Sequence, residues 1–159
     1  MSILRSDLVL RFLILSGLIL LCSCGKYGSP LPPEDFRPAG VRDLRVEGDS
    51  QGLEFSWLPP ATKIAGGPLD DLDGFTLGRA VVIDGERSKF RTIAKIGHNQ
   101  KQGPDGLQRR VAYKDSDVKP GLIYDYILHA FNKNGRKGLG SKVARIKFRG
   151  RSSDIEVLN

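Results

Sequence analysis

Apolar and polar residues alternate along most of the chain with a period of two, the spacing of side chains on the two faces of a β-strand. Helical periodicity does not appear after residue 38. Turn-forming pairs such as Pro59-Pro60, Pro120-Gly121 and Asn134-Gly135 separate the alternating segments. We predict seven short strands, at 41–46, 52–58, 74–83, 90–96, 107–113, 122–131 and 142–148. Their number and spacing are typical of an all-β sandwich.

Two of the predicted strands carry most of the expected core. One face of 52–58 and one face of 122–131 are apolar or aromatic at every second position. The residues on these faces are Leu53, Phe55, Trp57, Tyr124, Tyr126, Leu128 and Ala130. Burial of a tryptophan removes roughly 150–250 Å² from water, so Trp57 is expected at the centre of the core.

The opposite face of 122–131 is also largely apolar. Ile123, Ile127 and Phe131 alternate there with Asp125 and His129, whereas the solvated face of an antiparallel sheet is normally polar. Two interpretations stay open. Either these residues form a surface for a binding partner, or the long connection between the second and third strands covers them.

The beginning of the chain has a different composition. Two arginines precede an uninterrupted apolar stretch at 12–21, which has the length of a signal-peptide core and is shorter than the ~20 residues of a membrane-spanning helix. Leu21 stands three residues before Cys24, and the small Ser23 directly precedes that cysteine. This arrangement resembles the lipobox of bacterial lipoproteins. The resemblance implies cleavage before Cys24, which becomes the N-terminus and carries a diacylglycerol and often an N-acyl chain. The alternative is an ordinary signal peptide with an incidental cysteine.

Cleavage at this point leaves about 135 residues, enough for one domain with a hydrophobic core. No cysteine follows Cys24, so the domain has to fold without a disulfide in an oxidising compartment, and cysteine chemistry is excluded. The prolines that follow Cys24 predict an extended spacer. The expected organisation is a signal peptide at 1–23, a lipidated cysteine and proline-rich linker at 24–37, a domain at 38–149 and a tail at 150–159.

Several runs within the domain carry a resemblance to a second family. The first set is Pro38-x-x-Val41-x-x-Leu44, Leu53-x-Phe55-x-Trp57-x-x-Pro60 and Asp73-Gly74-Phe75-x-Leu77-x-Arg79. The second is Asp115-x-x-Val118-x-Pro120-Gly121-x-x-Tyr124-x-Tyr126. They resemble strands A, B and C and the E–F corner of fibronectin type III domains. The resemblance implies a single seven-stranded immunoglobulin-like sandwich, in which Tyr124 hydrogen-bonds to upstream backbone as a tyrosine corner.

The formal charge of +7 is concentrated late in the chain. Arg145, Lys147 and Arg149 belong to a run of cations that meets no acid before Asp154. Behind an export signal, nucleic acid is not an expected partner. The run predicts contact with anionic lipid head groups or lipopolysaccharide phosphates, or it is a solvated basic strand that keeps the domain soluble.

Residues for catalysis or for a cofactor are not arranged in any recognisable pattern. His98 and His129 are the only histidines and have no carboxylate pattern beside them, so no catalytic, metal or cofactor role is expected. Asp70, Asp71 and Asp73 form one candidate cation loop. Calcium takes six to eight oxygen ligands, more than this segment supplies, which favours a solvated acidic turn.

Together these expectations describe a non-enzymatic, lipid-anchored protein of the cell envelope whose domain binds or scaffolds a partner protein. By resemblance, Gly25 after the lipidated cysteine implies the outer membrane, facing the periplasm. One alternative is a lipopolysaccharide-transport assembly factor, because Cys24-Gly-x-x-Gly-x-x-Leu-x-Pro33 resembles the start of small lipoproteins with that role. A second alternative is a carbohydrate-binding accessory domain with Tyr27 and Tyr113 as exposed aromatic platforms.

Overall fold

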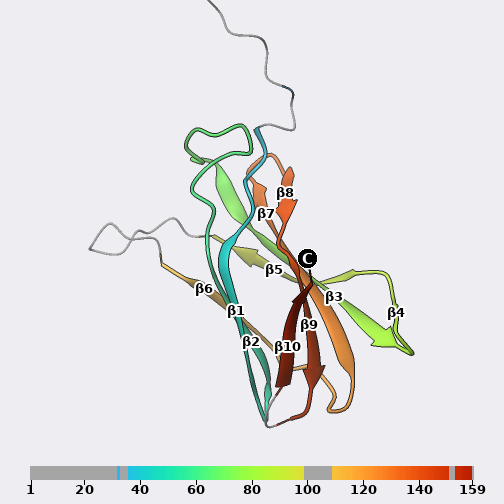
Figure 1. Ribbon diagram of the computed structural model, residues 1–159. Coiled ribbons are helices and arrows are strands. Elements are labelled where there is room, and N and C mark those ends of the chain that lie inside the picture. The colour runs from blue at the N-terminus through green and yellow to red at the C-terminus, as the bar shows by residue number, and fades with distance from the viewer. Residues whose placement is uncertain (1–31, 33–35, 99–108, 151–152, 159) are drawn as a thin grey trace, which may run out of the picture. The chain divides into compact units, whose positions relative to one another are not determined.

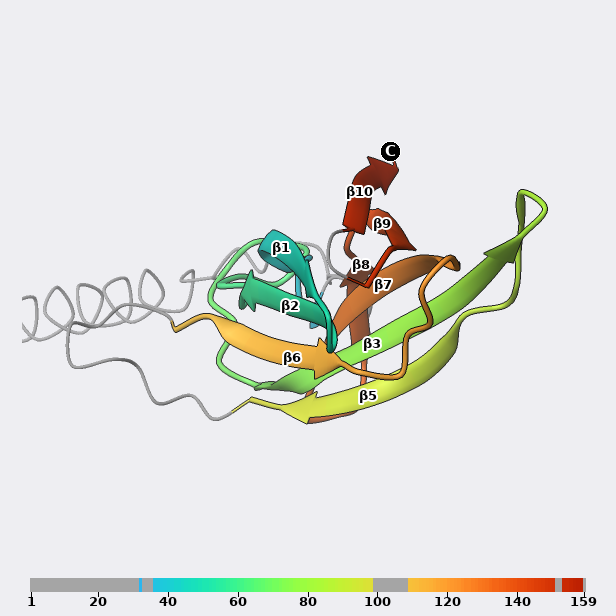
Figure 2. The same ribbon diagram turned by 90° about the horizontal axis from the view of Figure 1, so that it is seen from below.

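A computed structural model describes residues 32, 36–98 and 109–150, and the backbone of 153–158. The described chain forms an immunoglobulin-like β-sandwich of two antiparallel sheets (Figure 1 and Figure 2). The smaller sheet has the order β1-β2-β6. Its strands are β1 (Arg42–Asp49), β2 (Gly52–Leu58) and β6 (Val111–Asp115).

The larger sheet has the order β10-β9-β7-β3-β4, with β5 also paired to β3 and β8 to β7. Its strands are β3 (Leu72–Ile83), β4 (Glu86–Arg87), β5 (Arg91–Gly97), β7 (Ile123–Asn132), β8 (Lys137–Gly140), β9 (Val143–Phe148) and β10 (Ser153–Leu158). The long pair β3–β7 runs from Leu72 opposite Asn132 at one end to Val82 opposite Ile123 at the other. This pair fixes the long axis of the sandwich.

Each of the seven predicted strands corresponds to a strand of the structure, and the expected sandwich is confirmed. Asp84 and Gly85 form the turn that joins β3 to β4, and both residues have positive φ, as a type I′ hairpin turn requires. Three strands of the described part were not predicted. Two-residue β4 is too short for a pattern, glycine-rich β8 has poor strand propensity, and β10 lies in the segment expected to be a tail.

The core forms where the inner faces of the two sheets meet. Trp57, at 0% exposure, packs edge-on against Phe75 with ring centroids 5.3 Å apart. The Phe55 and Tyr126 rings pack in a tilted arrangement with centroids 4.6 Å apart. All the residues predicted to point inward are at most 3% exposed, namely Leu53, Phe55, Trp57, Tyr124, Tyr126, Leu128 and Ala130.

The expected tyrosine corner is also confirmed. The Lys119 backbone N–H donates a hydrogen bond of 2.9 Å to the Tyr124 hydroxyl. This bond fixes the connection from β6 to β7, which carries the chain from the smaller sheet to the larger one. Close to it, a second polar contact crosses the core.

Asp115 is the centre of this second contact and is 4% exposed. It ends β6, and its carboxylate accepts hydrogen bonds from Arg79 of β3 at 2.9 Å and from the Tyr126 hydroxyl of β7 at 2.8 Å. Arg79 also donates to Asp117 at 2.9 Å. We call Arg79, Asp115 and Tyr126 the cross-sheet clamp, because they join the edge of one sheet to two strands of the other.

The clamp shifts the ionisation of its members. Burial, together with the negative charge of Asp115, raises the pKa of the Tyr126 hydroxyl. Burial alone would lower the pKa of Arg79, but the hydrogen bond to Asp117 and the charge of Asp115 outweigh it and raise that pKa. The clamp therefore consists of a neutral phenol and a charged ion pair at neutral pH.

Replacement of Trp57 by alanine should lower the free energy of unfolding by about 3–5 kcal/mol, because a cavity replaces a fully buried ring. The Nε1 of Trp57 has no hydrogen-bond partner in the described residues, so the loss comes from packing. Chemical denaturation measures it. Leu139→Ala, at a position 52% exposed, is the control and should stay within about 0.5 kcal/mol of the parent. A Trp57→Ala protein as stable as the parent would contradict the assigned core.

The raised pKa of Tyr126 predicts a loss of stability at alkaline pH. Above pH ~10 the unfolded chain loses the tyrosine proton that the folded chain keeps, so the free energy of unfolding falls as pH rises. The slope from this residue reaches up to about 1.4 kcal/mol per pH unit. Urea unfolding between pH 9 and 11 should show a shallower decline in Tyr126→Phe. Equal declines in the two proteins would argue against a protonated, clamped Tyr126.

Candidate functional site

The predicted partner residues lie on the outer face of β7, in the middle of the larger sheet. Ile123, Ile127 and Phe131 stand opposite Val82, Gly78 and Gly74 of β3 in the register of the sheet. Ile123 and Ile127 are half-buried, and Phe131 is 5% exposed. The ammonium group of Lys95 on β5 lies 4.8 Å from the centre of the Phe131 ring and covers it.

Ile127 lies between two glycines. A Cβ atom at Gly78 would stand 3.2 Å from the Ile127 Cγ2 atom, and one at Gly140 would stand 2.8 Å from its Cδ1 atom. The side chain therefore rests on the bare backbone of β3 on one side and on the end of β8 on the other. We call Ile123 and Ile127 the apolar ridge. Its packing rests on these glycines, and Phe90 of the segment between β4 and β5 also lies over Gly78.

The connection from β2 to β3 is held away from this ridge by its hydrogen bonds. Ala39 donates to the Thr62 carbonyl at 3.0 Å, and Ile64 donates to the Arg37 carbonyl at 2.9 Å. Lys133, just after β7, donates to the Asp71 carbonyl at 2.8 Å. The connection is thus fixed at the end of the sandwich where the chain enters β1.

A buried ion pair lies beside the ridge. Asp125 is 0% exposed although it is on the outer face of β7. Arg145 of β9 covers it with two hydrogen bonds, Nε to Oδ1 at 2.8 Å and Nη2 to Oδ2 at 2.9 Å. Arg87 of β4 approaches from the other side at 3.7 Å. Two guanidinium groups cover one buried carboxylate, so this site has a net positive charge, and that charge faces outward.

The predicted basic residues have different roles in the structure. Arg145 is hydrogen-bonded to Asp125. It therefore covers this buried carboxylate and also adds positive charge to the outer face of the sheet. Lys147 is exposed and stands between Ile123 of β7 and Asp154 of β10 in the register of the sheet. Arg149 follows the end of β9 and is exposed. Period-two spacing places the three on one side of the sheet.

Both histidines have packing contacts. His129 is half-buried, and its Nδ1 atom lies 3.3 Å from the Gly138 carbonyl oxygen. His98 packs edge-on against Phe75 at 5.8 Å, and burial lowers the pKa of its imidazole. Neither contact is of a kind that activates a ring for catalysis.

The acidic segment Asp70–Asp73 does not converge on one point. Asp70 pairs with Lys63 at 3.1 Å, which lowers the pKa of its carboxyl group. Asp71 accepts a hydrogen bond of 3.0 Å from the Asn132 amide. Within the part of the chain that the structure describes, no three His, Cys, Asp or Glu residues are grouped so that they could hold a metal ion.

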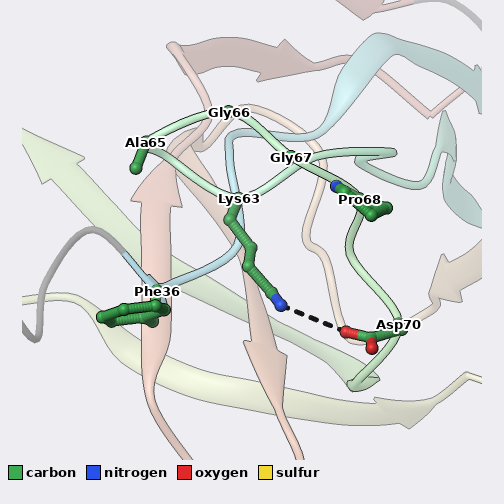
Figure 3. A pocket seen from close by; sticks show the side chains of 7 residues that line it. All are labelled: Phe36, Lys63, Ala65, Gly66, Gly67, Pro68 and Asp70. Atoms are coloured by element: carbon green, nitrogen blue, oxygen red, sulfur yellow. Dashed lines mark hydrogen bonds and ion pairs between the residues drawn. The ribbon is translucent and has the colours of Figure 1, made fainter. Parts of the chain in front are cut away.

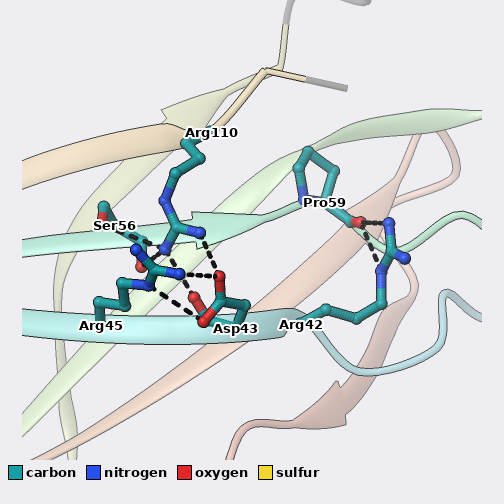
Figure 4. A network of polar contacts seen from close by, with 6 residues as sticks. All are labelled: Arg42, Asp43, Arg45, Ser56, Pro59 and Arg110. Carbon is teal, nitrogen blue, oxygen red and sulfur yellow. Dashed lines mark hydrogen bonds and ion pairs between the residues drawn. The ribbon is translucent and has the colours of Figure 1, made fainter. Parts of the chain in front are cut away.

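Sequence reasoning missed a polar cluster on the smaller sheet (Figure 4). Asp43 has a φ of 48° at a bulge in β1. Its carboxylate accepts hydrogen bonds from Arg45 and Arg110, which lower its pKa in that order. Arg110 also donates to the Ser56 carbonyl at 3.0 Å, and Arg42 to that of Pro59 at 3.2 Å. The cluster fixes a bulge on an edge strand, a feature that prevents edge-to-edge pairing.

Cys24 and most of the linker predicted at 24–37 lie outside the described residues, so the predicted lipid attachment is untested. In the described ranges, no helix has the length and hydropathy to span a membrane.

Comparison with known proteins identifies the fold. No family model and no curated protein matches the chain. A fibronectin type III domain from the human KIAA0970 protein is 16% identical, with 85% of this chain and 93% of that chain covered and a TM-score of 0.50. The twitchin kinase region of C. elegans is 21% identical over 71% of this chain, which spans 17% of that longer chain, with a TM-score of 0.48. The first likeness supports a fibronectin type III-like sandwich and concerns the fold alone.

Proposed function

We propose that this protein is a non-enzymatic binding module, held at the cell envelope by lipid on Cys24, that binds a partner protein through the outer face of its larger sheet. The observation that carries the proposal is the apolar ridge. Ile127 sits over glycine backbone on a sheet face where Arg145 and Lys147 of β9 and Arg87 of β4 lie beside the ridge. An apolar centre with a charged rim is the usual anatomy of a protein interface.

The rim defines the chemistry of the partner. Lys147 and Arg145 lie on the β9 side of the ridge, and Arg87 lies on the β4 side. Asp125 is covered by arginines and cannot repel an approaching anion. A complementary partner presents an apolar side chain to Ile127 and acidic groups to these cations. The alternative ligand is also negatively charged: it is an anionic lipid or lipopolysaccharide that binds at Arg145, Lys147 and Arg149.

The location follows from the sequence. The apolar leader and the residues around Cys24 support a lipid anchor, and Gly25 supports the outer membrane, facing the periplasm. Within the described residues, the structure adds no support for the other two candidate functions. Tyr113 packs against the core instead of forming an exposed platform. Tyr27 and the segment that resembles lipopolysaccharide-transport factors lie outside the described residues.

A photo-crosslinking amino acid at position 127, in lipidated protein in intact cells, should give one discrete protein adduct. A probe at Ile83 is the matched control, because it is an exposed apolar residue at the tip of the β3–β4 hairpin, 63% exposed. We expect no corresponding adduct there. Absence of an adduct at 127, or the same adduct from both positions, would contradict the proposed interface.

The variant Ile127→Lys separates binding from folding. We expect a melting temperature within a few degrees of the parent and loss of the partner identified by crosslinking, since a lysine stem can lie on the same glycine backbone. A collapse of the melting temperature would show instead that Ile127 is a core residue, and the partner surface would then be ruled out.

A further inference from the structure

The chain enters the sandwich at one end, beside the β2–β3 connection (Figure 1). Pro38 pairs with Lys63 as a β-bridge, and hydrogen bonds join Ala39 to Thr62 and Ile64 to Arg37. These contacts hold the first residues of the domain rigidly against the connection. The point at which any N-terminal anchor pulls on the domain is therefore fixed.

Strand β8 belongs to the same end. A side chain at Gly138 would collide with the Pro38 carbonyl, so β8 lies directly against the entering chain. Leu139, the next residue, is 52% exposed. We define the entry pole as this end of the sandwich, formed by Phe36, Lys63, Ala65, Pro68, Lys133, Lys137 and Leu139.

The entry pole is unusually apolar for a surface. Four large hydrophobic residues are exposed in the described chain, and two of them, Phe36 at 45% and Leu139, lie here. Phe36 also lines a shallow recess with Ala65, the Gly66-Gly67 turn and Pro68 (Figure 3). At the edge of this recess the charge of Asp70 is compensated by Lys63.

Cations border the apolar part. Lys133 and Lys137 flank the turn from β7 to β8, and both are exposed. Three acids lie here as well: Asp70 is paired with Lys63, Asp71 accepts a hydrogen bond from the Asn132 amide, and Asp73 is exposed. Aromatic and aliphatic side chains next to lysines suit the boundary between lipid head groups and acyl chains.

The length of the preceding chain limits where this pole can be. Eleven residues lie between Cys24 and Phe36, and a chain of this length spans at most ~40 Å. A lipid on Cys24 therefore keeps the entry pole within about that distance of the bilayer in any conformation of the linker. The pole is then the part of the domain whose distance from the head groups the linker limits most directly.

We propose that the entry pole docks on the head-group layer of the membrane that holds Cys24. Phe36 and Leu139 enter the interface, and Lys133 and Lys137 contact lipid phosphates. This inference rests on the proposed lipid anchor. Because β3 and β7 run from the entry pole to the opposite end, docking would stand the sandwich upright and leave the apolar ridge facing sideways, open to a partner.

The test uses lipidated mature protein in vesicles of phosphatidylethanolamine and phosphatidylglycerol. Single cysteines at Phe36→Cys and Leu139→Cys carry a polarity-sensitive fluorophore, since lipid occupies the only native thiol of the mature chain. The matched control is Ile83→Cys, an exposed apolar site at the far end of β3. We expect a blue shift, and quenching by nitroxide-labelled lipid, at 36 and 139 and neither effect at 83.

The outcomes separate this inference from the function on which it rests. Protein that floats with vesicles while both labels stay in water overturns docking and leaves the anchor intact. Protein that carries no lipid and does not float overturns the anchor itself. A blue shift that depends on protein density in the vesicles shows a second copy on the pole and also overturns docking.

Charge reversal tests the lysines. Lys133→Glu with Lys137→Glu should reduce the blue shift at both labels in vesicles rich in phosphatidylglycerol. Lys89→Glu with Arg91→Glu makes the same change in charge in the β4–β5 segment and should leave the shift unchanged. Equal effects of the two pairs would show that net charge rather than the entry pole governs contact with lipid.

Discussion

The two sheets of this sandwich depend on a polar contact at Asp115. Its carboxylate sits at the end of β6, 4% exposed, and binds Arg79 and Tyr126 of the opposite sheet. Breaking a buried ion pair by removing one partner commonly costs several kcal/mol, because the other charge is left uncompensated. With no cysteine after Cys24, this clamp and the packing around Trp57 perform the role that a disulfide has in many exported domains.

The clamp also separates the two surfaces that matter for function. It lies inside the sandwich, so the outer face of the larger sheet can carry the apolar ridge without contributing to the junction between sheets. The entry pole lies at the end of that sheet where β7 finishes and the chain begins. The two proposed contacts, with the membrane at the entry pole and with a partner at the apolar ridge, therefore lie on different parts of the sandwich, and each can be altered without the other.

Period-two alternation was sufficient to predict seven of the strands and the inward residues, because both depend on local spacing. The corner at Tyr124 was implied by the resemblance to fibronectin type III domains. The alternation could not predict contacts that form only when two strands pair in a particular register. The sequence does not show that Arg145 covers Asp125, since the two are joined only when β9 pairs with β7. Strand β8 was missed because Gly138 weakens its pattern, although close approach of Pro38 requires that glycine. The contact between Asp43 and Arg110 was likewise not predicted, because Arg110 directly precedes β6 and reaches Asp43 only when β6 and β1 both pair with β2.

Mass spectrometry of the mature protein purified from bacterial membranes tests the central claim, a binding domain held at a membrane by lipid on Cys24, most directly. The account predicts an N-terminal peptide that begins at Cys24 and carries the mass of a diacylglycerol, with or without an N-acyl chain. A peptide that begins at another residue, or an unmodified Cys24 in protein recovered from the soluble fraction, would contradict it.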